Sequence, residues 1–221
     1  MNKLLVANWK QNITLSGLRL WLTEFSELLE TKGYFKNVDI LLAPSFPYFS
    51  EIVPITVANT NTYICAQNVS EFNGGSHTGD ISATQLADYV KYCIVNHTET
   101  NTAPVSIKSR IENLVQAQIT PIVCFVDAPS KIAAMPACLY AWEDPNNISS
   151  GGEFKHPDYS TVHEKIAEFS SMLECDILYG GSVNKSNATE LANIPNVAGF
   201  LVGHASLDPE HFYALGSTLD S

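Results

Sequence analysis

The chain has 221 residues, which fits one large domain, and 45% of them are hydrophobic, which is enough for a substantial core. Its formal net charge of -11 comes with only 12 Lys and Arg residues, so the composition argues against nucleic acid and against an anionic membrane surface as partners. No apolar run is long enough to cross a bilayer, and the N-terminal segment becomes polar too soon for a signal peptide.

A strand followed by a helix is predicted at the start of the chain. Leu4–Asn8 is a short apolar run, and residues 18–29 then place apolar side chains at helical spacing, with Thr14 or Ser16 as the N-cap. Seven further runs also predict strands. In chain order they are Asp39–Ala43, Tyr63–Gln67, Cys93–Asn96, Ile122–Phe125, Leu139–Trp142, Ile177–Tyr179 and Phe200–Val202.

Helical patterns lie between these runs, for example over residues 107–115 and 162–173. Apolar strands that alternate with amphipathic helices are typical of a parallel sheet covered by helices. Eight such repeats favour a closed barrel over an open sheet. The sequence therefore predicts an α/β fold in which residues 1–221 form a single domain, a (β/α)8 barrel.

The interval between the fifth and sixth predicted strands is shorter than the others. It holds about a dozen residues, close to the minimum for a parallel crossover that includes a helix. Pro129 and Pro136 further restrict what a helix could occupy there. We therefore expect the fifth helix to be missing or reduced to a turn.

The cysteines give no sign of a metal or redox site. There are five, they form no CxxC pair, and four lie in apolar runs, so we interpret them as buried reduced thiols. With the absence of a membrane or secretion signal, this predicts a cytoplasmic protein.

Polar residues and glycines follow the ends of five predicted strands, where the functional groups of such barrels lie. Taken singly, each has an ordinary structural explanation. Together they supply a cation, a neutral hydrogen-bond donor and a carboxylate base, which are the groups needed to shift a proton beside a carbonyl. These residues are Asn8, Lys10, Asn96, His97, Glu99, Glu143, Gly180, Gly181, Ser182, Gly203 and His204.

Eight sequence blocks, in order and over nearly the whole chain, resemble the triosephosphate isomerase family. The short fifth interval and the NHTE block are similar to the compact members of that family. The blocks are ANWK (7–10), APSFPYF (43–49), AQNVS (66–70), GSHTGDIS (75–82), NHTE (96–99), AWE (141–143), ILYGGSVNKSNATEL (177–191) and GFLVGHASL (199–207).

The resemblance implies a role for each catalytic candidate. Glu143 would be the base that removes a proton beside the substrate carbonyl and returns it to the neighbouring carbon. His97 would donate to the enediolate oxygens as a neutral imidazole. Lys10 would stabilise the developing negative charge and the phosphate, and Asn8 would help to orient the phosphate. Glu99 would be a supporting carboxylate. The substrate would be a small phosphorylated triose, and the reaction would use no metal and no organic cofactor.

The resemblance also implies that backbone N–H groups bind the phosphate, which needs little net positive charge. Gly181 and Ser182 after the seventh strand, and Gly203 and His204 after the eighth, would provide them. His204 replaces the family's usual glycine, so its side chain would either crowd the phosphate or, when protonated, add a positive contact.

The loop after Glu143 departs most from the family pattern. Asp144 stands in place of a hinge proline, Asn146 in place of an aromatic residue, and Ser149 in place of a glycine that donates its N–H to phosphate. Two apolar residues, Ile148 and Leu201, would close over Glu143. We expect a working lid with altered closure kinetics.

The segment Val69–Asp80, with Thr78, resembles the loop that inserts beside the partner's active site in family dimers. We expect Trp9 and Phe72 to supply apolar contacts there, and we predict a homodimer, with a tetramer as the second possibility.

Two other functions are compatible with the sequence. One is a non-catalytic barrel of the same family that binds a phosphate or a partner, against which the joint presence of Lys10, His97 and Glu143 argues. The other is a different phosphate-binding barrel enzyme of the indole-glycerol or ribulose-phosphate type, which would not need these three residues together.

Overall fold

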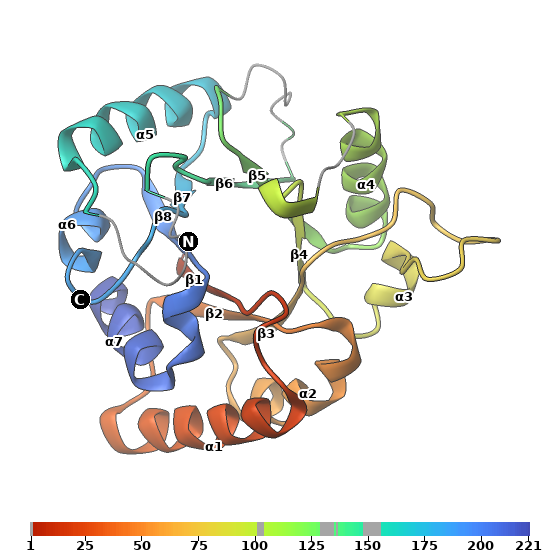
Figure 1. Ribbon diagram of the computed structural model, residues 1–221, viewed down its shortest axis with the longest axis horizontal. Coiled ribbons are helices and arrows are strands. Elements are labelled where there is room, and N and C mark those ends of the chain that lie inside the picture. Colours follow the sequence, from red (N-terminus) through yellow and green to blue (C-terminus); the bar gives the residue numbers. More distant parts are fainter. Residues whose placement is uncertain (1, 101–103, 129–134, 136, 148–155) are drawn as a thin grey trace.

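Eight parallel strands close into a barrel, and each strand pairs with the strands before and after it in the chain (Figure 1). This computed structural model describes residues 2–100, 104–128, 135, 137–147 and 156–221. All eight predicted strands are confirmed, with small differences at their ends. They are β1 Lys3–Asn8, β2 Val38–Ala43, β3 Thr62–Ala66, β4 Tyr92–Val95, β5 Thr120–Phe125, β6 Leu139–Trp142, β7 Ile177–Tyr179 and β8 Val197–Val202.

Helices surround the barrel and cover its outer face (Figure 1). In the interval between β5 and β6, described residues 126–128, 135, 137 and 138 carry no helix, in line with the predicted loss or reduction of the fifth helix. Pro129 and Pro136 lie outside the described residues. The helices are α1 Leu15–Lys32, α2 Phe49–Ala58, α3 Ala83–Leu86, α4 Pro104–Gln116, α5 Tyr159–Leu173, α6 Ala188–Ala192 and α7 Pro209–Asp220.

Side-chain caps fix where four of the described helices begin, namely α1, α3, α5 and α7. Of the two predicted caps for α1, Thr14 is used, because its side chain accepts a hydrogen bond from the N–H of Gly17. Asp158 and Asp208 cap α5 and α7 in the same way, and Ser82 forms a capping box with Gln85 at α3.

The alternation of strand residues divides the core into two layers. One layer fills the barrel and includes Leu4, Val6 and Ile94, while the other, which includes Leu5 and Ala7, packs between barrel and helices. Cys65 and Cys124 belong to the interior layer, where burial raises the pKa of both thiols. All five cysteines are free. Four are buried as predicted, whereas Cys175 is half-buried.

The alternation of inward and outward residues continues past the strand ends, so the residue two positions after an inward residue also points into the barrel mouth. Val6 is followed by Asn8, Ile94 by Asn96, and Ala141 by Glu143. The polar residues of the site therefore stand on top of the apolar residues that fill the barrel.

The segment between β3 and α3 extends away from the barrel (Figure 1). Phe72, in this segment, is 44% exposed and stacks on the ring of His77. The expectation that Trp9 contributes to a dimer contact is wrong, because Trp9 is fully buried. Its indole packs edge-on against Trp21 and donates to the carbonyl of Ser206. Within the described part of the chain, no helix is long and apolar enough to span a bilayer.

Closure of the barrel depends on Gly199, which lies on β8 opposite Leu4 of β1. Its φ is +141°, and a Cβ atom there would lie 1.9 Å from the carbonyl oxygen of Leu4. A side chain at this position would therefore force the first and last strands apart.

We predict that Gly199→Ala lowers the free energy of unfolding by more than about 3 kcal/mol, because it combines backbone strain with a steric clash. Urea denaturation measures this loss. Gly74→Ala is the matched control, since a Cβ there meets nothing within 4 Å. Similar urea midpoints for the two variants would contradict the assigned role of Gly199.

Candidate active site

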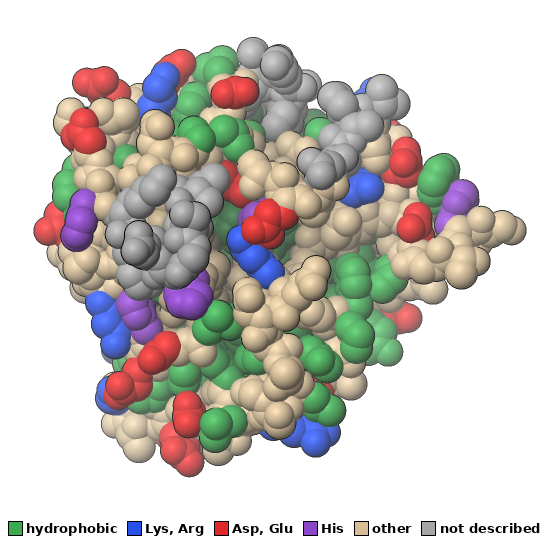
Figure 2. All heavy atoms as spheres, in the orientation of Figure 1, with side chains coloured by type: hydrophobic (Ala, Val, Ile, Leu, Met, Phe, Trp, Pro, Cys, Tyr) green, Lys and Arg blue, Asp and Glu red, His purple; other side chains and the backbone are tan. Residues whose placement is uncertain are grey.

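The three predicted catalytic side chains converge at the mouth of the barrel. The Nε2 atom of His97 lies 3.2 Å from Oε2 of Glu143, and the Nζ atom of Lys10 lies 2.5 Å from Oε1 of Glu99. Figure 2, in the orientation of Figure 1, shows a Lys or Arg side chain beside an Asp or Glu side chain near the centre of the molecule. Strands β1, β4 and β6 thus bring together residues that are far apart in the chain.

The carboxylate of Glu143 is buried and fully hydrogen-bonded. Only 4% of the residue is exposed. Oε1 accepts from the backbone N–H of Thr98 at 2.9 Å, and Oε2 accepts from the Thr98 hydroxyl at 2.7 Å. Because buried carboxylates are costly unless they are hydrogen-bonded, Thr98 makes this position of Glu143 tolerable.

The hydrogen bonds of His97 define its tautomer. Its Nδ1 accepts from the backbone N–H of Glu99 at 3.3 Å, so a neutral ring carries its proton on Nε2, the atom that faces Glu143. Burial lowers the pKa of His97 and outweighs the opposing effect of Glu143, while the charge of Lys10 lowers it further. His97 is therefore suited to act as a neutral donor.

Lys10 has a strained backbone that neighbouring strands hold in place. Its φ is +51°, a region that non-glycine residues seldom occupy. Its carbonyl accepts from the side chains of Gln67 and Ser45, and its N–H donates to Oδ1 of Asn8. The backbone at Lys10 is thus fixed by residues from β1 and from the ends of β2 and β3.

The turns after β7 and β8 lie at the same end of the barrel. Ser182 has a φ of +49°, and its buried hydroxyl has no hydrogen-bond partner among the described residues. A Cβ atom on Gly203 would lie 3.7 Å from Cε of Lys10, so the Lys10 side chain reaches the turn after β8. His204 is exposed and begins the 3-10 helix His204–Leu207.

The remaining predicted site residues differ in what the structure says of them. Leu201 is buried at the end of β8 and belongs to the barrel interior, and Thr78 is exposed in the protruding segment. Ile148 and Ser149 lie outside the described residues, and so does most of the predicted lid.

Sequence reasoning missed several residues that support the site. Gln67 comes two residues after Cys65 of β3, and Ser45 comes two residues after Ala43 of β2. Since Cys65 and Ala43 face the barrel interior, continuing the alternation past the strand ends would have found both residues. Thr98 lies inside the NHTE block, but nothing in the sequence assigns its hydroxyl to Glu143. Tyr179 donates to Oδ2 of Asp144 at 3.0 Å, a contact between residues 35 positions apart.

A buried carboxylate beside an imidazole N–H, with an ammonium group near by at the mouth of a (β/α)8 barrel, defines an enzyme that transfers protons beside a carbonyl group. The triosephosphate isomerase family model matches residues 3–137 and 126–219. The chain belongs to the triosephosphate isomerase family.

Curated relatives match the chain over almost its whole length. The triosephosphate isomerase of Thermus thermophilus is 31% identical, covering 97% of this chain and 98% of the relative. The triosephosphate isomerase of Mesomycoplasma hyopneumoniae strain 7448 is 30% identical, covering 96% of this chain and 97% of the relative. The triosephosphate isomerase of Polynucleobacter asymbioticus is 27% identical, covering 96% of this chain and 97% of the relative.

We predict that the ring of His97 titrates with a midpoint below 6.5, because burial disfavours its charged form. Since the unfolded chain binds this proton more readily, the contribution of neutral His97 to stability is present above pH 6.5 and is lost as the pH falls toward the folded-state pKa. Nitrogen-15 NMR of labelled histidine, assigned with His97→Gln, measures both the midpoint and the tautomer. A His97 ring half protonated at pH 6.5 or above would contradict the prediction.

Proposed function

We propose that Glu143, His97 and Lys10 carry out the reaction of this family, the interconversion of dihydroxyacetone phosphate and D-glyceraldehyde 3-phosphate. The observation that carries the proposal is the placement of the buried Glu143 carboxylate within 3.2 Å of a His97 nitrogen that bears the proton in the neutral ring. A base and a neutral donor at this spacing suit proton transfer at two adjacent carbons.

Glu143 takes a proton from the carbon beside the substrate carbonyl and returns it to the neighbouring carbon. Each of its oxygens accepts one hydrogen bond from Thr98, which holds the carboxylate in place and leaves a further lone pair on each oxygen for the substrate's proton. His97 donates from Nε2 to the oxygens of the enediolate intermediate. The ammonium group of Lys10 stabilises the negative charge that develops there.

The phosphate group binds to backbone N–H groups at Gly181, Ser182, Gly203 and His204. The unpartnered hydroxyl of Ser182 supports this assignment, since a buried donor without a partner is costly and phosphate oxygens would satisfy it. The family resemblance also assigns a backbone N–H donor to Ser149, which lies outside the described residues. The resemblance assigns to Leu201 and Ile148 the exclusion of water from Glu143, which would strengthen the electrostatic interactions in the site.

We predict that Glu143→Gln lowers kcat by about 10³-fold, because the amide cannot accept the proton. The measurement is turnover of D-glyceraldehyde 3-phosphate in an assay coupled to reduction of dihydroxyacetone phosphate. Glu112→Gln makes the same chemical change in an exposed residue of α4 and should keep full activity. Equal activity in the parent and Glu143→Gln would refute the assigned base.

Competition by phosphoglycolate separates this function from that of other phosphate-binding barrels. Phosphoglycolate resembles the enediolate, so it should compete with the triose phosphate and inhibit the reaction. Nothing in the site favours a non-catalytic barrel, because the base, the donor and the cation are all present.

We further propose a cytoplasmic homodimer. The protruding segment Val69–Asp80 presents the exposed Thr78 and Phe72 away from the body of the chain, where a second copy can receive them (Figure 1). A tetramer built from such dimers is the second possibility.

We predict that the parent sediments as a dimer or larger at micromolar concentration, and that Thr78→Arg shifts it toward the monomer, because it places a bulky charge at the contact. Sedimentation velocity measures this change. Thr189→Arg, which places the same charge at an exposed position of helix α6, should leave the assembly intact. A monomeric parent would rule out both the dimer and the tetramer.

A further inference from the structure

Two buried side-chain oxygens have no hydrogen-bond partner among the described residues, and they lie at opposite ends of the barrel. Oγ of Ser182 belongs to the turn after β7, where the phosphate is proposed to bind. Oγ1 of Thr62 belongs to the first residue of β3, at the amino end of the barrel. Because a buried hydroxyl without a partner is costly, Thr62 marks a second place where a group from outside the chain would be stabilised.

Thr62 lines a cavity of about 240 Å³. The cavity lies between the end of α1, the start of β2 and the turn that joins α2 to β3. Tyr63 and Cys65 face the barrel interior, so Thr62 faces outward, into the layer between barrel and helices. Only 2% of Thr62 is exposed, so its hydroxyl is shielded from bulk water beside this cavity.

The inner wall of the cavity is apolar and firmly packed. Its residues are at most 8% exposed, and they are Leu29, Phe35, Val38 and Ile40. The ring of Phe35 packs on Tyr213, with centroids 5.0 Å apart, and a Cβ atom on Gly216 would lie 2.4 Å from its Cζ. Phe35 therefore has little room to move, and the wall is formed before any ligand arrives.

The rest of the lining is polar and uncharged. Asn59, Thr60 and Asn61 of the turn border the cavity together with the exposed Tyr34, and the described lining holds no acidic or basic side chain. The carbonyl of Asn59 accepts from the N–H of Thr62 at 3.1 Å, and that of Asn61 accepts from the N–H of Ile40 at 2.7 Å. Since nothing in the lining compensates a charge, the cavity suits a neutral molecule.

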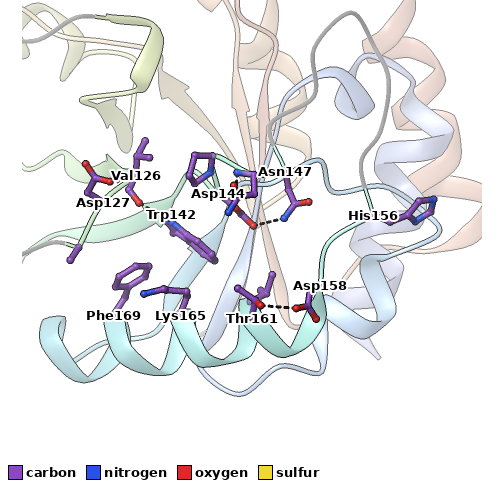
Figure 3. A pocket seen from close by; sticks show the side chains of 14 residues that line it. Val126, Asp127, Trp142, Asp144, Asn147, His156, Asp158, Thr161, Lys165 and Phe169 are labelled. Atoms are coloured by element: carbon purple, nitrogen blue, oxygen red, sulfur yellow. Dashed lines mark hydrogen bonds between the residues drawn. The ribbon is translucent and has the colours of Figure 1, made fainter.

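A larger cavity, of about 490 Å³, differs in this respect (Figure 3). Its buried carboxylate, Asp144, accepts from the hydroxyl of Tyr179 at 3.0 Å, the side-chain amide of Asn147 at 2.6 Å and the backbone N–H of Asn146 at 3.1 Å. No buried side-chain oxygen or nitrogen among the described residues that line it lacks a partner. The smaller cavity therefore carries the stronger sign of a ligand.

We propose that the cavity beside Thr62 binds a small neutral molecule with one aromatic ring and one hydroxyl or carbonyl group. The polar group pairs with the hydroxyl of Thr62, and the ring packs against Phe35. An apolar cavity of about 150 Å³ holds a benzene molecule, so this larger one accommodates a ring with a short substituent. The site lies at the other end of the barrel from Glu143, so its ligand stabilises the fold without taking part in the reaction.

Benzyl alcohol is the probe, and toluene, which has the same ring and no hydroxyl, is its match. Both are titrated into the parent and Thr62→Val while the backbone amide signals are followed by NMR. Benzyl alcohol should bind the parent with a Kd on the order of 1 mM, which its eight non-hydrogen atoms can supply. The signals that shift should be those of residues 34–40 and 58–62, and not those of the turn 180–182.

Thr62→Val should weaken the binding of benzyl alcohol about 10-fold, because the hydroxyl of the probe is left without its partner. The binding of toluene should change by about threefold or less, since toluene makes no such bond. The variant should keep or raise the urea midpoint of the parent, because an apolar group replaces an unpaired buried hydroxyl. Weaker binding then cannot be due to a damaged fold.

Thr120→Val is the matched control. Thr120 is the first residue of β5, as Thr62 is of β3, and it does not line the cavity. This variant should leave both dissociation constants unchanged.

Three results would overturn the proposal. If residues 58–62 do not shift in the parent, the cavity does not take the ring, and the Thr62 hydroxyl is left to a water molecule. If Thr62→Val weakens both probes equally, or neither, the assigned polar contact is wrong. If the shifts centre on the turn 180–182, the probe binds at the active site instead.

Discussion

The period of two along each strand is the constraint on which the site depends. In a closed parallel barrel all carboxyl ends meet at one mouth, so every inward position just beyond a strand points into the same small volume. Asn8, Gln67, Asn96 and Glu143 occupy such positions. The apolar residues beneath them fill the barrel, and this packing fixes the strands to which the polar residues are attached.

Burial is the second condition that shapes the site, because the adjacent carboxylates of Glu143 and Asp144 are both buried and need hydrogen-bond donors. Glu143 is supported by Thr98 and faces His97, whereas Asp144 is supported by Tyr179 and Asn147. The two side chains therefore use separate sets of donors. This separation lets one carboxylate exchange its partners during a reaction while the other keeps its own.

Strand periodicity and the family blocks predicted the fold, the short fifth interval and the convergence of Lys10, His97 and Glu143. The Trp9 prediction failed because Trp9 continues the outward face of β1, where it packs against Trp21 of α1 inside the core between barrel and helices. Asp144 was expected only to disturb the hinge, since its partner Tyr179 is distant in the sequence and no local pattern joins them. The resemblance alone assigns roles to Ile148 and Ser149.

The pairing of Lys10 with Glu99 has a consequence for how substrate arrives. The ammonium charge at the mouth is already offset by a carboxylate at 2.5 Å, and the molecule as a whole carries a net charge of -11. A dianionic substrate is therefore not drawn in from a distance by the protein's field. If the phosphate binds as proposed, its attraction begins only at the N–H groups of the turns after β7 and β8, whose partial charges act over a few ångström. Encounter should thus be slower than in a barrel with a cationic rim, and added salt, which screens long-range repulsion, should not slow it.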